Sequence, residues 1–197
     1  MRIVLATNNN GKLREFRELL SPLGFEIEPL AQFTRVNAEE TGLSFIENAI
    51  LKARYASQAA NLPAIADDSG IEVDALRGEP GIYSARYAGE GASDQANLDK
   101  LLGALADVPL ARRTARYQCA LAFMRWPTDP SPLICQAGWE GRVIATPRGA
   151  GGFGYDPIFE LPELGKTAAE LEPAEKNRIS HRGKALRELV AQLRARM

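Results

Sequence analysis

The sequence has few cysteines and no long apolar run, and each shortage excludes a class of protein. The two cysteines, Cys119 and Cys135, lie in strand-like apolar contexts without the spacing of metal ligands. Two buried free thiols in a reducing cytosol are the simplest explanation. No apolar run approaches the ~18 residues of a membrane-spanning helix, and the N-terminal strand leads directly into a polar loop. We therefore expect a cytoplasmic protein with no secretory signal and no membrane contact.

An excess of charge of either sign is also missing. The 24 Lys and Arg residues are balanced by 25 Asp and Glu residues, which gives a formal net charge of −1. Proteins that bind duplex nucleic acid usually carry a basic domain or stripe, so a nucleic-acid-binding function is disfavoured. A small phosphorylated ligand in a local basic cleft remains compatible with this balance.

The order of apolar patterns predicts an α/β fold. The chain has 197 residues, of which 45% are hydrophobic and 25% charged, as expected for one soluble globular domain or for two lobes that share a sheet. Helices and strands alternate at the start and strands cluster later, which favours a mixed sheet. The predicted strands are Arg2–Ala6, Phe25–Pro29, Ala64–Ala66, Ile71–Leu76, Thr114–Trp126, Leu133–Trp139 and Gly141–Ala145, and the predicted helices are Gly11–Leu20, 45–61, Ser93–Leu105 and Ser180–Arg196.

The first strand leads into TNNNGK, which has features of an anion site. It is not a Walker A loop, because Ala6 replaces the first glycine and Leu13 the hydroxyl residue of that motif. Backbone N–H groups and the positive end of a helix dipole would nevertheless face a phosphate here, with Lys12 in the first turn. The alternative is a simple β–α turn with an Asn N-cap, and this stretch alone favours that alternative.

Acidic residues occur in two further loops. Asp67 and Asp68 follow a short apolar strand in AIADDSG, where α/β sheets bind ligands, although an Asx-turn explains them equally well. Because strand side chains alternate, we expect only one of the two to enter a given cleft. Glu39 and Glu40 precede a helix whose capping box starts at Ser44; they suit Mg²⁺, or they form a solvated loop.

Two later segments combine glycines, aromatic residues and cations. GGFGYDP lets the backbone approach a ligand closely while Phe153 stacks on it, although a tight turn with one core aromatic residue is the simpler interpretation. In EKNRISHRGKAL, Ser180 is a natural N-cap and the cations His181 and Arg182 follow in the first turn, where acids are normally favoured. A broken local rule of this kind indicates a function.

Taken together and in order, these segments resemble the inosine triphosphate pyrophosphatase family, the XTP/dITP diphosphatases. The motifs that carry the resemblance are LATNNNGK (5–12), EETGLSFIENAILKA (39–53), ADDSGIEVDAL (66–76), PGIYSARY (80–87), GGFGYDPIF (151–159) and EKNRISHRGKAL (175–186). One departure is Asn8, which stands where the family usually has Gly. The resemblance implies an elongated mixed sheet flanked by helices, as one domain over residues 1–197, with the active site in a cleft between two lobes.

The resemblance also implies the reaction and its residues. It implies Mg²⁺-dependent hydrolysis of ITP, dITP and XTP to the monophosphate and pyrophosphate, by a homodimer. Asp68 is the implied catalytic residue, with Asp67 in support, and Glu39, Glu40 and Asp68 are the implied metal ligands. The implied substrate contacts are Thr7, Asn8, Asn9, Asn10, Gly11, Lys12, Lys52, Ser69, Phe153, Gly154, Tyr155, Asp156, Lys176, His181 and Arg182.

Two other function classes compete with this hypothesis. A nucleotide kinase would use the N-terminal loop, but the broken Walker pattern and the lack of an acceptor motif count against it. A non-catalytic purine nucleotide-binding module is the main alternative. It would retain function in Asp68→Asn, whereas the hydrolase would lose turnover with little loss of binding.

Overall fold

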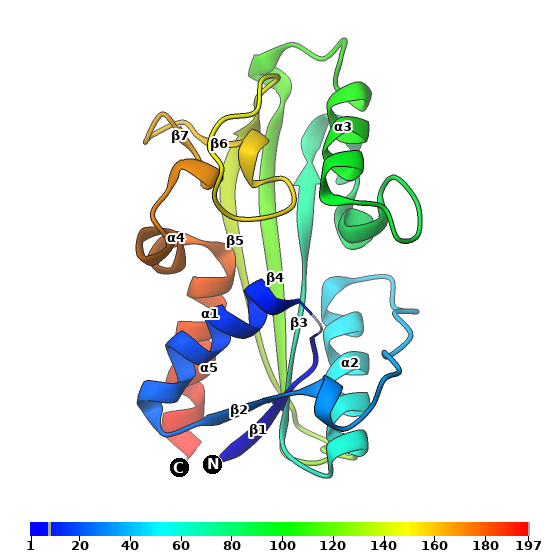
Figure 1. Cartoon of the computed structure of the whole chain (residues 1–197), viewed down its shortest axis with the longest axis vertical. Helices are drawn as coiled ribbons and strands as arrows, with labels where there is room; N and C mark the ends of the chain where they lie inside the picture. Colours follow the sequence, from blue (N-terminus) through cyan, green and yellow to red (C-terminus); the bar gives the residue numbers. More distant parts are fainter. Residues whose placement is uncertain (8, 197) are drawn as a thin grey trace. The chain divides into compact units, whose positions relative to one another are not determined.

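The computed structural model, which describes residues 1–7 and 9–196, is an α/β structure with one mixed sheet (Figure 1). The strands follow the order β2-β1-β3-β4-β5-β6-β7. β1 is parallel to β2 and β3, whereas β6 is antiparallel to β5 and β7, so the predicted fold class is confirmed. The strands are β1 Arg2–Leu5, β2 Glu26–Pro29, β3 Ala64–Val73, β4 Thr114–Met124, β5 Leu133–Val143, β6 Phe159–Leu161 and β7 Lys166–Thr167, and the α-helices are α1 Asn10–Leu20, α2 Phe45–Ala60, α3 Asp94–Ala104, α4 Pro173–Ile179 and α5 His181–Arg196.

The chain divides into two compact units. Unit 1 comprises Met1–Asp68, Cys119–Ala137 and Lys184–Met197, and unit 2 comprises Ser69–Gln118 and Gly138–Gly183. The expectation of a single domain over residues 1–197 stays a prediction. No helix in the described part of the chain is long and apolar enough to cross a membrane.

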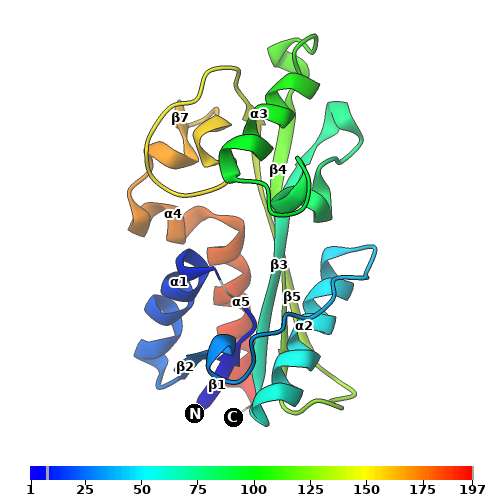
Figure 2. The same cartoon turned by 45° about the vertical axis from the view of Figure 1, so that its right-hand side comes forward.

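Unit 1 has helices on both faces of its strands. α1 and α5 lie side by side on one face and α2 covers the other, as both views show (Figures 1 and 2). Phe16 of α1 and Leu189 of α5 are fully buried against Ile3 and Leu5 of β1. Each such side chain contributes roughly 1.5–3 kcal/mol by burial. This packing fixes the start of α1, and therefore the loop that precedes it.

Unit 2 is built around α3 and a group of aromatic side chains. Leu98, Leu101 and Leu105 pack in the same core cluster as Tyr117 and Trp139. Tilted ring contacts of 4.6 Å and 5.4 Å between ring centroids join Phe159 to Tyr117 and to Trp139. Such contacts hold aromatic rings in defined orientations. The candidate site residues of unit 2 therefore pack on a rigid aromatic core.

The largest difference from the predicted elements lies in the acidic segment. The sequence predicts two strands separated by a turn at DDSG, but β3 runs without interruption from Ala64 to Val73. Asp67 and Asp68 therefore lie inside a strand, not at its end, and the Asx-turn alternative is wrong. An extended chain is tolerated here because both carboxylates bind lysine ammonium groups, which offset the cost of their burial.

Other boundaries also differ. β5 is one strand where two were predicted, and Gly141 lies within it. A Cβ at Gly141 would lie 2.6 Å from the Glu160 carbonyl oxygen, so the close approach of the two strands favours glycine here. α4 was not predicted, and Ser180 separates it from α5. The capping box of α2 is only half formed. Ser44 accepts the Glu47 amide, but the Glu47 carboxylate accepts from the Leu43 amide instead of the Ser44 amide.

Candidate functional site

In unit 1, Lys52 of α2 joins two of the predicted acidic residues. Its Nζ lies 2.6 Å from Asp68 Oδ1 and 3.0 Å from Glu40 Oε1. All three side chains are largely removed from solvent, with 13% of Lys52, 9% of Asp68 and 27% of Glu40 exposed. The structure thus brings Glu40, Lys52 and Asp68 together, in a group with two carboxylates and one ammonium ion.

The pKa values of this group reflect that excess of negative charge. Burial raises the pKa of Asp68 above its ordinary value; Lys52 opposes this effect and Glu40 reinforces it. Burial lowers the pKa of Lys52, but the carboxylates of Asp68 and Glu40 outweigh burial, so the net shift is upward. Burial is the main cause of the shift in Asp68, whereas the neighbouring carboxylates cause the upward shift in Lys52. With two carboxylates and one ammonium ion, the group carries an excess of negative charge. The group therefore attracts a further cation.

One atom of Asp68 is available for a ligand. Its Oδ2 is buried and has no hydrogen-bond partner among the described residues. A buried acceptor without a partner is costly and is usually found where a water or ion binds. Within residues 1–7 and 9–196, no group of three or more His, Cys, Asp or Glu side chains is placed to hold a metal ion. Mg²⁺ needs fewer, because it binds one or two carboxylates plus water and phosphate oxygens.

Asp67, the neighbour of Asp68 in β3, points the opposite way. Its Oδ1 accepts from Lys12 Nζ at 2.7 Å, and its Oδ2 lies 3.7 Å from Cys119 Sγ. Asp67 thus binds a lysine of α1 while Asp68 binds a lysine of α2, as the alternation of strand side chains requires. Asp67 holds the ammonium group of Lys12 in place, which agrees with the supporting function that the resemblance implies.

The N-terminal loop has the geometry of a capped helix. Asn9 Oδ1 accepts from the backbone N–H groups of Gly11 (2.8 Å) and Lys12 (3.1 Å), so these two amides already have a partner. The Asn9 amide donates to Thr7 Oγ1 at 3.1 Å. The N-cap interpretation is therefore correct for Asn9. Asn8 and the side chain of Asn10 lie outside the described residues.

The loop before α2 distinguishes its two acidic residues. Glu39 is exposed, whereas Glu40 is partly buried and contacts Lys52. Asn48 of α2 fixes this loop, because its Oδ1 accepts from the Gly42 amide at 2.9 Å. A Cβ on Gly42 would lie 2.6 Å from Glu47 Cβ, so this close approach requires glycine. Asn48 was not predicted from the sequence, where it is one more polar residue of a helix.

In unit 2, Asp156 connects β4, the glycine-rich loop and α4. Its Oδ2 accepts from Lys176 Nζ at 2.6 Å and from the Phe153 amide at 2.8 Å. Its Oδ1 accepts from the hydroxyl of Tyr117 at 3.3 Å. Asp156 is buried, with 3% of its surface exposed, and both of its oxygens are used. It therefore positions the other side chains.

Phe153 is half-buried and has two cations near its ring. Lys176 Nζ lies 4.9 Å and the Arg182 guanidinium 5.6 Å from the ring centroid, which is cation–π range. Arg182 also donates to Ser69 Oγ at 3.1 Å. The structure thus brings Ser69, Phe153, Lys176 and Arg182 into one group.

His181 lies in an aromatic stack that the sequence does not predict. Its ring is 4.8 Å from that of Tyr117 at an angle of 10°, and 6.2 Å from that of Trp139. Burial, and next the carboxylate of Asp156, raise the pKa of the Tyr117 hydroxyl well above its usual value, so this hydroxyl stays protonated and donates. Tyr117 and Trp139 lie in predicted strands, where an aromatic residue is ordinary. No sequence signal marks them.

The remaining two predicted contacts, Gly154 and Tyr155, differ in their surroundings. The Gly154 amide donates to Asp94 Oδ2 at 2.8 Å, which ties the glycine-rich loop to the start of α3. Tyr155 lies in the core, with its hydroxyl donating to the Ser84 carbonyl at 2.7 Å. Burial raises the pKa of this hydroxyl, so it remains a donor. The side chain of Tyr155 therefore supports the loop from beneath.

Comparisons with known proteins agree on one family. The sequence model of the Ham1 family matches residues 3–192. The chain is 59% identical, over 98% of its length and 97% of the relative's, to a protein of Vibrio parahaemolyticus named dITP/XTP pyrophosphatase. It is 60% identical, over the full length of both, to one of Thioalkalivibrio sulfidiphilus with the same name. A solved HAM1 protein from Coxiella burnetii has a TM-score of 0.92 and 48% identity, covering 99% of each chain.

Proposed function

This chain belongs to the Ham1 family, and on that premise we propose that it is a nucleoside triphosphate pyrophosphatase. The proposed substrates are the deaminated purine nucleotides ITP, dITP and XTP, and the products are the monophosphate and pyrophosphate. The names of the two relatives support the activity. The observation in this chain that carries the proposal is Asp68, a buried carboxylate that binds Lys52 of α2 through one oxygen and keeps the other oxygen spare.

Unit 1 is proposed to bind the polyphosphate. Lys12 and Lys52 supply positive charge, and the start of α1 supplies the positive end of a helix dipole. Thr7 and Asn9 add polar atoms in the loop before that helix. Because Lys12 and Lys52 are held by Asp67 and Asp68, their ammonium groups are ordered before the substrate arrives. Preorganised charge of this kind provides most of the catalysis in phosphoryl transfer.

The acidic group fits a magnesium ion. Glu40 and Asp68 are the residues that would hold it, and the excess of negative charge and the spare Asp68 Oδ2 support that assignment. Glu39 is a second choice, since it is exposed. When bound, Mg²⁺ would neutralise phosphate charge and lower the pKa of a bound water. The preference for Mg²⁺ over other divalent cations belongs to the proposal.

Asp68 is proposed as the base. A water hydrogen-bonded to the Asp68 carboxylate would attack the α-phosphorus, and the bond from that phosphorus to the bridging oxygen would break. The proton of the water passes to Asp68, and pyrophosphate leaves. A raised pKa makes Asp68 a better proton acceptor than an ordinary aspartate, which favours this function.

Unit 2 is proposed to bind the purine. The half-buried ring of Phe153 offers a stacking surface, and the donors Lys176 and Arg182 lie near it. His181, which precedes Arg182 in α5, is proposed as a further donor. Inosine and xanthosine have a carbonyl acceptor at the six-position, where adenine has an amino donor. A donor aimed at that position would be left without a partner by ATP, and such mismatches discriminate strongly.

The test is pyrophosphate release from ITP, XTP, ATP and GTP, with and without Mg²⁺. We expect rapid release from ITP and XTP, slow release from ATP and GTP, and no release after chelation. Orthophosphate instead of pyrophosphate would place the attack at the γ-phosphorus and contradict the mechanism. A chain that binds ITP without turnover would be the purine nucleotide-binding module that we regard as the alternative function.

Two properties of the whole protein complete the proposal. We propose a homodimer in the cytoplasm, as the family resemblance implies. Sedimentation equilibrium measures the first, and a mass of one chain at micromolar concentration would contradict it. Fractionation of cells measures the second.

A further inference from the structure

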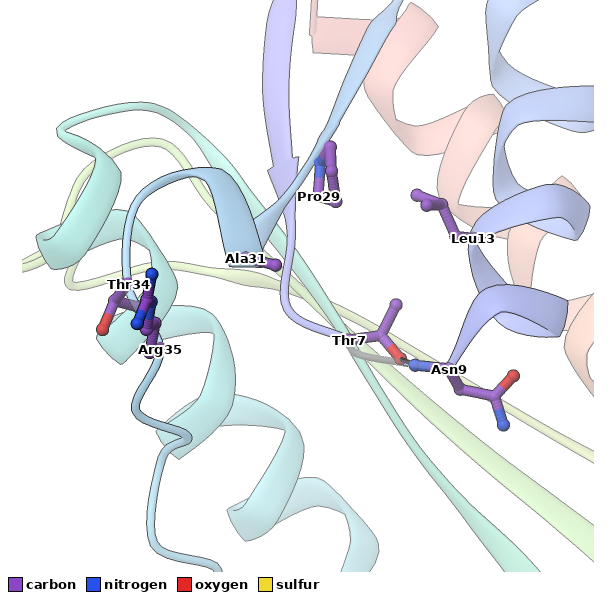
Figure 3. Close-up of a pocket in the computed structure, with 7 residues that line it drawn as sticks. All are labelled: Thr7, Asn9, Leu13, Pro29, Ala31, Thr34 and Arg35. Atoms are coloured by element: carbon purple, nitrogen blue, oxygen red, sulfur yellow. Dashed lines mark hydrogen bonds between the residues drawn. The ribbon is translucent and has the colours of Figure 1, made fainter.

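Unit 1 contains a cavity of about 390 Å³ whose lining includes none of Glu40, Asp67 and Asp68. Figure 3 shows that its lining comes from the loop after β1, the start of α1, the last residue of β2 and the segment after β2. The polar residues of the lining are Thr7, Asn9, Thr34 and Arg35, and the apolar ones are Leu13, Pro29 and Ala31.

The strand order explains the place of this cavity. β1 lies between β2 and β3 and is parallel to both, with Leu5 paired to Pro29 on one side and to Ile65 on the other. The residues that follow each of these three therefore lie toward the same edge of the sheet. The carboxylates belong to β3 and the cavity lies on the β2 side, about two strand spacings or ~10 Å away. A chain of phosphates that starts near Asp68 would have to pass Thr7 and Asn9 to enter the cavity.

Arg35 is the cation of this cavity. It is exposed and makes no ion pair with any carboxylate in the described part of the chain. Lys12 and Lys52, in contrast, are both bound to aspartates. These two lysines and their partners Glu40, Asp67 and Asp68 together have a net charge of −1. A polyphosphate therefore meets no surplus of protein positive charge there, whereas Arg35 offers a full positive charge.

The backbone around Arg35 is held on both sides. The amide of Thr34 donates to the Leu30 carbonyl, and the amide of Val36 donates to Thr34 Oγ1 at 3.1 Å. Thr34 Oγ1 also lies 3.3 Å from the hydroxyl of Tyr55 on α2. Arg35 is thus presented from an anchored turn. Its guanidinium has five donors in a plane, the form that suits phosphate oxygens.

From this arrangement we propose that Arg35 is a specificity-determining residue, which contacts the terminal phosphates of the substrate in this cavity. The inference rests on the proposed function. The hydroxyl of Thr7 and the Nδ2 of Asn9 donate to no other described residue, so they are available to the same phosphates. Arg35 thereby favours triphosphates over shorter nucleotides and retains pyrophosphate after cleavage.

The experiment measures binding apart from turnover. Inorganic tripolyphosphate is titrated with Mg²⁺ into Asp68→Asn by calorimetry, alone and combined with Arg35→Gln, Arg35→Lys or Arg14→Gln. Arg14 is an exposed arginine of α1 outside the cavity lining, so it controls for net charge. We expect Arg35→Gln to raise the Kd for tripolyphosphate about tenfold, as loss of one charge-assisted hydrogen bond would, with inosine monophosphate binding unchanged. Arg35→Lys should recover part of the loss.

An unchanged Kd in Arg35→Gln, or an equal loss in Arg14→Gln, would overturn the inference. Kinetics separate it from the proposed function. In a wild-type background we expect Arg35→Gln to raise the KM for ITP with kcat within about twofold, since the contact is made before and during the reaction. Pyrophosphate release by the wild type with an unchanged KM in Arg35→Gln would support the function and refute the contact. If the chain releases no pyrophosphate but its tripolyphosphate binding depends on Arg35, the contact is supported and the proposed function is refuted.

Discussion

Each unit buries a lysine–aspartate pair with the same separation, and the two pairs have opposite surroundings. Lys52 and Asp68 of unit 1 lie 2.6 Å apart beside a further carboxylate, Glu40. Lys176 and Asp156 of unit 2 also lie 2.6 Å apart, but beside the rings of Phe153 and Tyr117. The first pair is surrounded by charge and the second by aromatic surface.

The two aspartates differ in whether a carboxylate oxygen remains without a hydrogen-bond partner. Both oxygens of Asp156 accept hydrogen bonds within unit 2, so this carboxylate is saturated. Asp68 keeps one buried oxygen without a partner among the described residues. A saturated carboxylate stabilises its surroundings, and an unsaturated one binds or reacts. We therefore expect loss of Asp68 to affect turnover and loss of Asp156 to affect folding.

Asp68→Asn tests the reactive side of this comparison and should have the largest effect. Asn has almost the same shape and still accepts from Lys52, but it is a poor proton acceptor. We expect kcat for ITP to fall by about 10²–10⁴-fold, with little change in the free energy of unfolding, because Lys52 keeps Glu40 as a counter-ion. Asp99→Asn, an exposed aspartate of α3, is the control. Pyrophosphate release and urea unfolding measure the two quantities, and near-normal kcat in Asp68→Asn would contradict the assignment.

Asp156→Asn tests the saturated side. The change leaves the buried ammonium group of Lys176 without its counter-ion, and stranded buried charges cost about 3–5 kcal/mol of unfolding free energy. Replacing both partners, in Asp156→Asn with Lys176→Met, should restore part of that loss because no buried charge remains. Urea unfolding of the two variants measures it. If the double variant is no more stable than the single one, the ion pair does not hold unit 2.

Gly152→Ala tests the packing around Asp156 through a change at a backbone position. Gly152 has a φ of +74°, and a Cβ there would lie 2.0 Å from Asp156 Oδ2. Overpacking and backbone strain together should cost about 2 kcal/mol or more. Gly154→Ala is a matched control, because its φ is +61° but a Cβ there has no neighbour within 4 Å. Strain alone should cost it about 1 kcal/mol. Equal losses would mean that contact with Asp156 is unimportant.

How much of the site the sequence could predict depends on whether a residue lies in a local motif. The carboxylates, lysines and Phe153 occur in local motifs with unusual residue types, and each was predicted by number. Tyr117, Trp139 and Asn48 also belong to the two groups, yet each lies in an ordinary strand or helix pattern. Only tertiary packing places their side chains, so no local signal could mark them.

The fold shows a similar limit at β3. Sequence patterns correctly predict strands on both sides of DDSG, because apolar alternation is a local property. They fail at the acidic residues themselves, since two adjacent aspartates normally favour a turn. The chain stays extended because Lys12 and Lys52 approach from different helices, and that information lies 55 and 16 residues away in sequence. Arg35 escaped prediction for a related reason, since the cavity is formed by segments distant in sequence.

Tyr117→Phe is a milder test of Asp156. It removes the hydroxyl that donates to Asp156 Oδ1 but keeps the ring that stacks on His181. We expect a loss of about 0.5–1.5 kcal/mol in unfolding free energy. If the hydroxyl also orients the purine-binding side chains, the KM for ITP should rise while kcat is maintained. Steady-state kinetics measure this. An unchanged KM would restrict Tyr117 to a structural function.

The smallest effect is expected for the exposed ion pair of Arg116 and Asp74. Comparison with the two buried lysine–aspartate pairs shows how much burial adds to the effect of an ion pair on stability. Hydrogen bonds from Arg116 and then Thr114 lower the pKa of Asp74, whose side chain is 45% exposed. A lowered pKa stabilises the fold fully above the unfolded value of 3.8, and that stability is lost as the pH falls through the folded value. Solvent screening should limit the effect to about 0.5 kcal/mol. Asp74→Asn should therefore be slightly less stable than the wild type in urea at pH 7, and the two should converge as the pH falls well below 3.8. A difference that persists in acid would assign the effect to packing instead of charge.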